Sequence, residues 1–168
     1  DLCNKGDERD FTGPCRLLCV AAASTQCAAT DLCLLASGSF RGKRNSSDGS
    51  TYVPAGHARA QQALAPLLRQ RPGSDKLYTQ DALKGFLVPL VQRGYLHRET
   101  RKGGYASYDV YSCALRGRAV ADGNAQVRLP PPAFVVDAER RERARADERR
   151  AELEAAGANI SSIPPDQL

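Results

Sequence analysis

The segment between Leu77 and Arg118 constrains the fold of this chain more than any other. Apolar side chains recur at helical spacing from Ala82 to Val91, as expected of a helix with one face in a core. Thr79 can cap the first turn of that helix, and Gly94 can end it in a left-handed conformation. Pro89 implies a kink or an early end. The segment therefore begins with an amphipathic helix.

Two strand-like runs follow this helix. Residues 95–99 and 108–113 are rich in aromatic side chains and alternate roughly between polar and apolar positions. Between them lies the stretch from Arg101 to Tyr105, which is too polar and too glycine-rich to belong to a core. We therefore predict a β-hairpin with a cationic, aromatic tip, and an α+β fold class.

Three further helices are predicted before this segment. Residues 11–26 and 28–36 have helical composition and an apolar face, and residues 57–70 follow as a helix that Pro66 would kink or end. Residues 40–56 are loop-like. With their Gly, Ser and Asn they form either a phosphate-binding arm or a solvated insertion.

The cysteines are more typical of a core than of a metal site. Cys15, Cys19, Cys27 and Cys33 contain no CxxC pair and have no nearby His, whereas structural zinc sites usually supply ligands in tight pairs. Free cysteine behaves as a small hydrophobic residue. We therefore expect buried thiols and a reducing compartment.

Positive charge is concentrated in the middle of the chain. Residues 38–128 hold 15 Lys or Arg against 6 Asp or Glu, although the whole chain carries a net charge of only +5. A concentrated positive region favours a polyanionic partner, because binding phosphates releases counterions. The alternative is an ordinary solvated surface.

Enzymatic motifs do not occur in the sequence. It has no GxxxxGK[ST] loop for ATP, and neither His57 nor His97 lies in a recognisable catalytic motif. The longest apolar run, residues 17–23, is far shorter than the roughly 20 residues of a membrane-spanning helix. We therefore expect no catalytic residue and no membrane span in this chain.

Several short motifs occur in an order that resembles the RQC domain of RecQ-family DNA helicases, most of all the Werner syndrome helicase type. The resemblance covers about residues 1–132 and rests on the following stretches: residues 10–14 with Leu17-Leu18, residues 35–39, residues 86–96, the hairpin, Gly117-Arg118 and Leu129-Pro130. It implies a winged helix, which is a helix-turn-helix core with a β-hairpin wing. In this family the wing separates the strands at a duplex end, while separate motor domains hydrolyse ATP.

The resemblance assigns a role to each residue of the tip. Arg101 and Lys102 would hold backbone phosphates, Gly103 and Gly104 would allow the sharp turn, and Tyr105 would stack on the terminal base pair. Tyr108 is the second candidate for the wedge, and Tyr105 could instead be no more than an exposed turn residue.

Duplex-binding positions of the family carry over to the end of the second helix. Ser37, Gly38 and Ser39 would bind phosphate, with backbone N–H groups that small polar residues leave free to meet an anion. A looser transfer adds four residues whose place in the family pattern is less fixed: Arg41, Lys43, Arg44 and Thr79.

The two ends of the chain differ from its middle. Cys3 resembles the last ligand of the family's zinc motif, so residues 1–9 would be the remnant of a zinc-binding subdomain, with zinc bound only in the full-length protein. Residues 10–132 would form the winged helix. Residues 133–168 form a charged tail, helical over about residues 137–156 and supported by ion pairs. The chain is therefore expected to be a segment of a larger protein.

These assignments lead to functional expectations. The chain is expected to be a monomeric DNA-binding domain for duplex ends, forks or quadruplexes, needing no cofactor itself, within a 3'-5' helicase that requires ATP, Mg and Zn. Such a protein would act in replication, recombination and repair in the nucleus, or in a bacterial cytoplasm. The alternatives are a winged-helix transcription regulator and a protein-interaction module.

Overall fold

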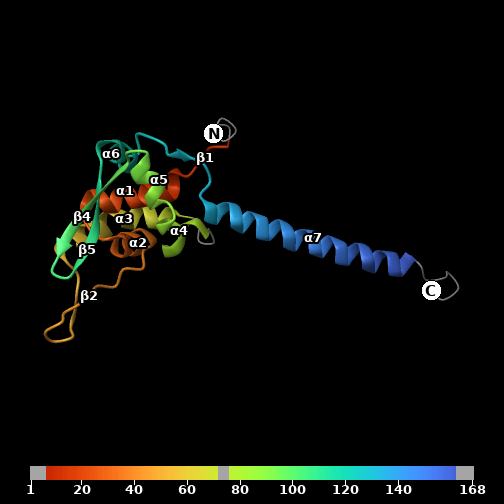
Figure 1. Ribbon diagram of the computed structural model, residues 1–168, viewed down its shortest axis with the longest axis horizontal. Helices are drawn as coiled ribbons and strands as arrows, with labels where there is room; N and C mark the ends of the chain where they lie inside the picture. Colours follow the sequence, from red (N-terminus) through yellow and green to blue (C-terminus); the bar gives the residue numbers. More distant parts are fainter. Residues whose placement is uncertain (1–6, 72–75, 162–168) are drawn as a thin grey trace. The chain divides into compact units, whose positions relative to one another are not determined.

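A computed structural model describes residues 7–71 and 76–161 of the chain, with side chains as far as residue 157. The chain divides into two compact units, Asp1–Pro132 and Ala133–Leu168 (Figure 1). The fold is mixed α+β, as the sequence predicts. Within the described residues, no helix has both the length and the apolar character needed to cross a bilayer.

The first unit consists of short helices and three two-stranded sheets. Its helices are α1 (Thr12–Ser24), α2 (Ala29–Ser37), α3 (Ala55–Gln70), the 3-10 helix η2 (Lys76–Tyr78), α4 (Gln80–Lys84), α5 (Leu87–Gln92) and α6 (Leu115–Ala121). Its strands are β1 (Arg9–Asp10), β2 (Lys43–Arg44), β3 (Thr51–Tyr52), β4 (Leu96–Gly103), β5 (Ala106–Cys113) and β6 (Arg128–Leu129). Each sheet is an antiparallel pair: β1–β6, β2–β3 and β4–β5.

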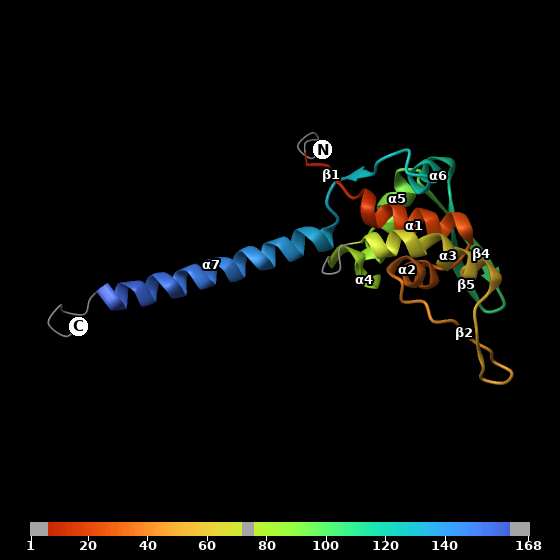
Figure 2. The ribbon, with the colours of Figure 1, turned by 180° about the vertical axis from the view of Figure 1, so that it is seen from behind.

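Helix α1 lies at the centre of the core. It packs against α2, α3, α6 and β5 (Figure 2). Side chains around most of its circumference are buried, which is the pattern of a helix enclosed by its neighbours. The predicted thiols, Cys15 and Cys19 among them, are free and buried. Burial raises the pKa of Cys27 to about 12 and that of Cys33 to about 11, so both thiols stay protonated at neutral pH.

The predicted helix before the hairpin is interrupted. Helix α4 ends at Lys84 and α5 begins at Leu87, with Gly85 and Phe86 between them. The cause is Pro89, which has no N–H to donate to the carbonyl group four residues earlier, at Gly85. The apolar stripe survives the break, because Leu83, Phe86, Leu87 and Leu90 are all buried. Gly94 ends α5 with a φ of 80°, as predicted.

One prediction between α2 and α4 needs correction. Residues 40–56 are not simply a loop, since β2 and β3 pair within them to form a second hairpin. Helix α3 runs to Gln70 as predicted, so of the two expected effects of Pro66 the early end does not occur. Pro66 is exposed, so water can hydrogen-bond to the carbonyl group that loses its intrahelical donor.

The second unit is the single helix α7 (Ala133–Ser161). It is longer than the predicted 137–156 but has the expected surface, with most side chains exposed and an ion pair between Arg150 and Asp147. Acidic and basic side chains are mixed along this helix, as expected of a helix whose surface is exposed to water.

Candidate nucleic-acid interface

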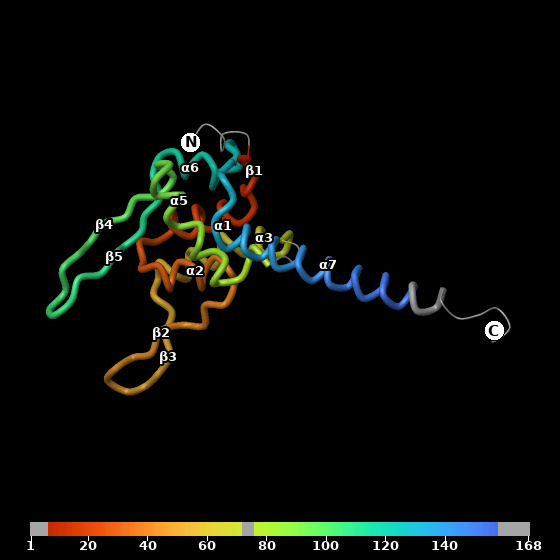
Figure 3. Tube along the Cα trace, turned by 45° about the vertical axis from the view of Figure 1, so that its right-hand side comes forward, coloured from red at the N-terminus to blue at the C-terminus, as the bar shows by residue number. Residues whose placement is uncertain are grey.

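The β4–β5 hairpin, which we call the wing, is a regular ladder. It pairs from Leu96 opposite Cys113 to Gly103 opposite Ala106, so only Gly104 and Tyr105 form the turn (Figure 3). Gly104 has a φ of 41°, a conformation that suits glycine in a two-residue turn. The strands are therefore longer than predicted, and Tyr105 stands fully exposed at the end of the ladder.

Gly103 has a different role from the one predicted. It belongs to β4 and has no positive φ, so it does not make the turn. Instead, a Cβ at this position would lie 2.9 Å from the Tyr108 ring, which packs over the glycine. Tyr108 remains half-exposed beside this contact. Two glycines in a row would by themselves make the tip flexible. Packing of the Tyr108 ring against Gly103 restricts that flexibility.

The base of the wing is anchored in the core. Leu96 and Val110 are buried, and so is Tyr111. The backbone of Tyr111 also exchanges two hydrogen bonds with Cys27, which lies between α1 and α2, at N···O distances of 2.9 and 3.3 Å. Helix α6 fits closely against this base, because Gly117 has no side chain. A Cβ at this position would clash with the Tyr95 carbonyl oxygen.

The basic side chains of the wing lie on both faces. Arg101 faces the same way as Tyr108, and its guanidinium group donates to Gln26 Oε1 at 3.0 Å and to Glu99 Oε2 at 3.5 Å. Strand alternation places Arg98 and Lys102 together on the other face, both exposed. The sequence interpretation missed Arg98, although its even, four-residue spacing from Lys102 would have placed the two on one face of a strand.

The predicted phosphate site at the end of α2 is not available in the form expected. The N–H groups of Gly38 and Ser39 already donate to the carbonyl groups of Leu35 and Leu34, in the left-handed cap that ends the helix. Ser37 is buried, and its hydroxyl donates to the Leu34 carbonyl at 3.1 Å. The expectation that these N–H groups are free for an anion is therefore wrong. A helix C-terminus also carries the negative end of the helix dipole.

Thr79 serves α4 rather than facing a ligand. Its hydroxyl oxygen accepts from the N–H of Ala82 at 3.2 Å, which confirms the predicted cap. The same hydroxyl donates to the Lys76 carbonyl at 3.3 Å. The Thr79 hydroxyl, predicted to bind phosphate, thus makes both of these hydrogen bonds within its own segment.

The remaining predicted cations lie on or beside the second hairpin. Arg41 and Arg44 are exposed. Lys43 Nζ lies 2.9 Å from Asp31 Oδ2, and His57 Nε2 donates to the same oxygen at 3.1 Å. Burial opposes ionisation of Asp31, but the hydrogen bonds from Lys43 and His57 outweigh it and hold the pKa of this carboxyl group below its ordinary value. The hydrogen bond to Asp31 in turn raises the pKa of Lys43.

Helix α3 presents a polar face that the sequence interpretation did not assign. Arg59, Gln62 and Arg69 are exposed at spacings of three and seven residues, and the helix contains no Asp or Glu. Its buried positions are His57, Ala60 and Leu64. The sequence signal for this polar, basic face was the absence of Asp and Glu from all 16 residues of the helix.

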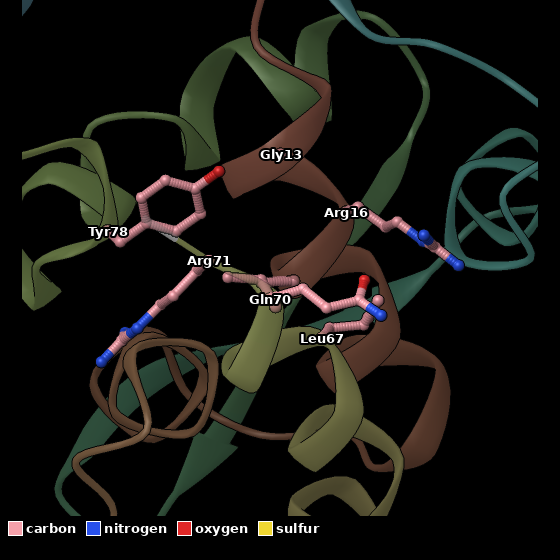
Figure 4. A pocket seen from close by; sticks show the side chains of 7 residues that line it. Gly13, Arg16, Leu67, Gln70, Arg71 and Tyr78 are labelled. Atoms are coloured by element: carbon pink, nitrogen blue, oxygen red, sulfur yellow. The ribbon is translucent and has the colours of Figure 1, made fainter. Parts of the chain in front are cut away.

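A small pocket lies where α1, α3 and η2 meet (Figure 4). Its volume is about 170 Å³, and its lining includes Leu67, Gln70 and Tyr78, with the Tyr78 hydroxyl directed at Gly13. The two arginines at its edges are engaged: Arg16 donates to the Ala121 carbonyl at 3.3 Å and Arg71 to that of Ser37 at 2.7 Å. No carboxylate or imidazole lines it.

Comparisons with known proteins add no relative. No protein-family model, no curated protein and no solved structure matches this chain. Cys3, the expected zinc ligand of the full-length protein, lies outside the described residues, so its role stays a prediction.

Proposed function

We propose that residues 10–132 are a winged-helix DNA-binding domain of the RQC type, working within a RecQ-type 3'-5' DNA helicase whose motor domains lie elsewhere in the parent protein. The observation that carries the proposal is the wing: a rigid ladder rooted in the core that ends in the exposed ring of Tyr105. We place the parent protein in the nucleus, in replication, recombination and repair.

The order of elements supports the winged-helix part of the proposal. Helices α1, α2 and α3 pack against one another, and the wing follows them. Cys27, between α1 and α2, forms a single antiparallel bridge with Tyr111 of β5 and so ties the helical core to the base of the wing. A winged helix needs these components: a helical core that supports a β-hairpin.

The chemistry of the wing suits the end of a DNA duplex. Tyr105 projects an aromatic ring that can stack on the last base pair, and stacking is worth about 1–3 kcal/mol per base. That is enough to offset much of the cost of unpairing one step. Arg98 and Lys102, on one face of β4, can hold phosphates behind the tip. The wing would thus act as a passive wedge that the motor domains push into the duplex.

Binding measurements test the proposal. The full chain is titrated by fluorescence anisotropy against a blunt duplex, a forked duplex, a single strand and a quadruplex at two salt concentrations. We expect binding that weakens as salt rises, because phosphate contacts release counterions. Lys102→Ala should reduce affinity and the salt dependence together. Indifference to all four DNAs would overturn the proposal.

A second measurement tests the wedge in the parent helicase. Tyr105→Ala should slow strand separation while leaving DNA-stimulated ATP hydrolysis largely intact, because the ring does not belong to the motor. Tyr105→Phe, which keeps the stacking surface, is the matched control. Unchanged unwinding by the alanine variant would move the wedge away from Tyr105.

The polar face of α3 favours one alternative function, a winged-helix regulator that reads base sequence. Arg and Gln are side chains that make bidentate contacts with base edges, and Arg59, Gln62 and Arg69 lie exposed on this helix. Selection from a random-sequence duplex pool separates the two proposals: a regulator enriches one sequence, and a structure-specific domain enriches none.

A further inference from the structure

The β2–β3 hairpin, here called the short hairpin (residues 41–53), projects from the same side of the first unit as the wing. Figures 1, 2 and 3 show both hairpins extending together from that side. The short hairpin has two residues in each strand, against eight in each strand of the wing. The proposed wedge mechanism leaves this second projection without a role.

Both hairpins pair a basic residue with a half-exposed tyrosine across their two strands. On the wing, Arg101 lies directly opposite Tyr108, and on the short hairpin, Lys43 lies directly opposite Tyr52. The two tyrosines are equally accessible, with 49% exposure for Tyr52 and 50% for Tyr108. An exposed ring on a basic hairpin is the combination that binds an unpaired base and its phosphate.

The short hairpin is organised before any ligand binds. Gly42 has a φ of 121°, and a Cβ there would lie 2.6 Å from Thr51 Cγ2 and 3.0 Å from the Tyr52 carbonyl oxygen. In the turn, Asn45 accepts the N–H of Ser47 at 2.9 Å, and Asp48 accepts that of Ser50 at 2.9 Å. These contacts fix the backbone that carries the Tyr52 ring, which reduces the entropy lost on binding.

The charge of the short hairpin matches a nucleic-acid strand. Lys43 is paired with Asp31, and the guanidinium group of Arg41 donates to the Gly38 carbonyl, so we assign the phosphate contact to the exposed Arg44. The hairpin has one acidic side chain, that of Asp48. The exposed aromatic surface of the hairpin is the Tyr52 ring. A single ring is too small to hold a folded protein but is large enough to stack on one base.

We infer that the short hairpin binds one single-stranded arm of a forked DNA while the wing occupies the junction. The inference rests on the proposed function, since it takes the wing as the element at the point of strand separation. Strands opened there leave the junction with unstacked bases, beside a second projection that offers Tyr52 for stacking and Arg44 for phosphate. The domain would therefore prefer a fork to a blunt duplex of equal length.

Variants of the short hairpin test this preference. Affinities of the full chain for a forked and a blunt duplex are measured by fluorescence anisotropy for Tyr52→Ala, with Tyr52→Phe as the matched control. Loss of the stacking ring should weaken fork binding about ten- to a hundredfold. Binding of the blunt duplex should change by less than about twofold, and the phenylalanine variant should behave as the parent. Arg44→Ala should weaken fork binding in the same selective way, with smaller effect at high salt.

The outcomes separate this inference from the proposed function. If Tyr52→Ala and Arg44→Ala bind the fork as the parent does, the inference is wrong and the wing proposal stands. An equal loss on both DNAs also overturns it, because the short hairpin would then contact the duplex. A parent chain that binds neither of these two DNAs overturns the inference, and the proposed function falls with it if the single strand and the quadruplex are not bound either. Circular dichroism and thermal unfolding of each variant, beside Leu115→Ala as an exposed control on α6, show that the comparison is between folded proteins.

Discussion

The wing and the short hairpin expose the same kind of surface but are held in place by different means. The wing has a backbone ladder eight residues long, and its base lies in the core through Leu96, Val110 and Tyr111. The short hairpin has two residues in each strand and makes no comparable ladder. An isolated hairpin of that size is at best marginally stable in water.

Side-chain contacts hold the short hairpin instead. Its base is tied to α2 by the ion pair between Lys43 and Asp31, and the ring of Phe40 packs against that of His57 with centroids 4.9 Å apart. Gln61, on α3, donates to the Phe40 carbonyl at 3.1 Å. We therefore expect the long ladder to tolerate changes at its tip, and the short hairpin to depend on a few residues near its base.

The largest effect is expected from Leu96→Ala at the base of the wing. Leu96 is 1% exposed, and truncating a buried leucine costs about 2–5 kcal/mol of unfolding free energy. Urea unfolding followed by circular dichroism measures the loss. His97→Ala, one residue along and exposed, is the control and should change stability by less than about 0.5 kcal/mol. Equal effects of the two variants would mean that the wing is not rooted in the core.

A pair of glycine substitutions tests the difference between the two ladders. Both Gly42 and Gly104 have positive φ, so alanine is strained at either position by about 1–2 kcal/mol. Gly42→Ala also meets Thr51 and the Tyr52 carbonyl group, whereas a Cβ at Gly104 meets nothing within 4 Å. We expect Gly42→Ala to open the short hairpin and Gly104→Ala to leave the wing paired.

Hydrogen exchange resolves the two glycine variants. In Gly42→Ala, protection should fall at the amides of Asn45 and Gly49, which donate within the short hairpin. In Gly104→Ala, protection of the wing amides nearest the core should match that of the parent chain. Loss of protection throughout the wing would show that its ladder is no more robust than the short one.

A smaller effect is expected from Asp31→Asn, and it should depend on pH. The pKa of Asp31 is lowered in the folded state, so its carboxylate stabilises the fold above its ordinary value of about 3.9, and that contribution is lost as pH falls through the lower folded value. Loss of the pairing with Lys43 and His57 should cost about 1 kcal/mol at neutral pH, since Lys43 is partly exposed.

Urea titrations at stepped pH values measure the effect of Asp31→Asn. The difference in unfolding free energy between parent and variant should shrink as the pH falls below about 4, because the parent carboxyl group becomes protonated there too. Asp137→Asn, on the exposed surface of α7, serves as the control and should show no such trend. A constant difference across the range would mean that the charge of Asp31 does not hold the short hairpin.

The sequence predicted the elements whose signals are local. We could predict the Thr79 cap and the Gly94 terminus because a single residue determines each of them. The apolar stripe before the wing was predicted from the spacing of side chains within about ten residues. The wing was predicted as well, from its alternating strands, and the thiols were predicted to be buried from their apolar surroundings.

The predictions that were wrong or incomplete depend on contacts between distant residues. Pairing of β2 with β3 needs the close approach that Gly42 permits and the ion pair from Asp31 to Lys43, neither of which is visible in the composition of residues 40–56. The N–H groups after α2 were expected to be free, but the left-handed cap at Gly38 uses them. Gly103 was taken as part of the turn, because only the structure shows the Tyr108 ring above it.

The smallest effect on stability is expected at the tip of the wing. Tyr105 is fully exposed, so Tyr105→Ala removes almost no packing and should change the unfolding free energy by less than about 0.5 kcal/mol. Tyr108→Ala is the informative partner, because that ring covers Gly103 and its loss should cost more. Urea unfolding of both variants measures the order. If Tyr105→Ala proved the more destabilising, the ring would have a structural partner, and its exposure would no longer argue for a surface kept free to meet a base pair.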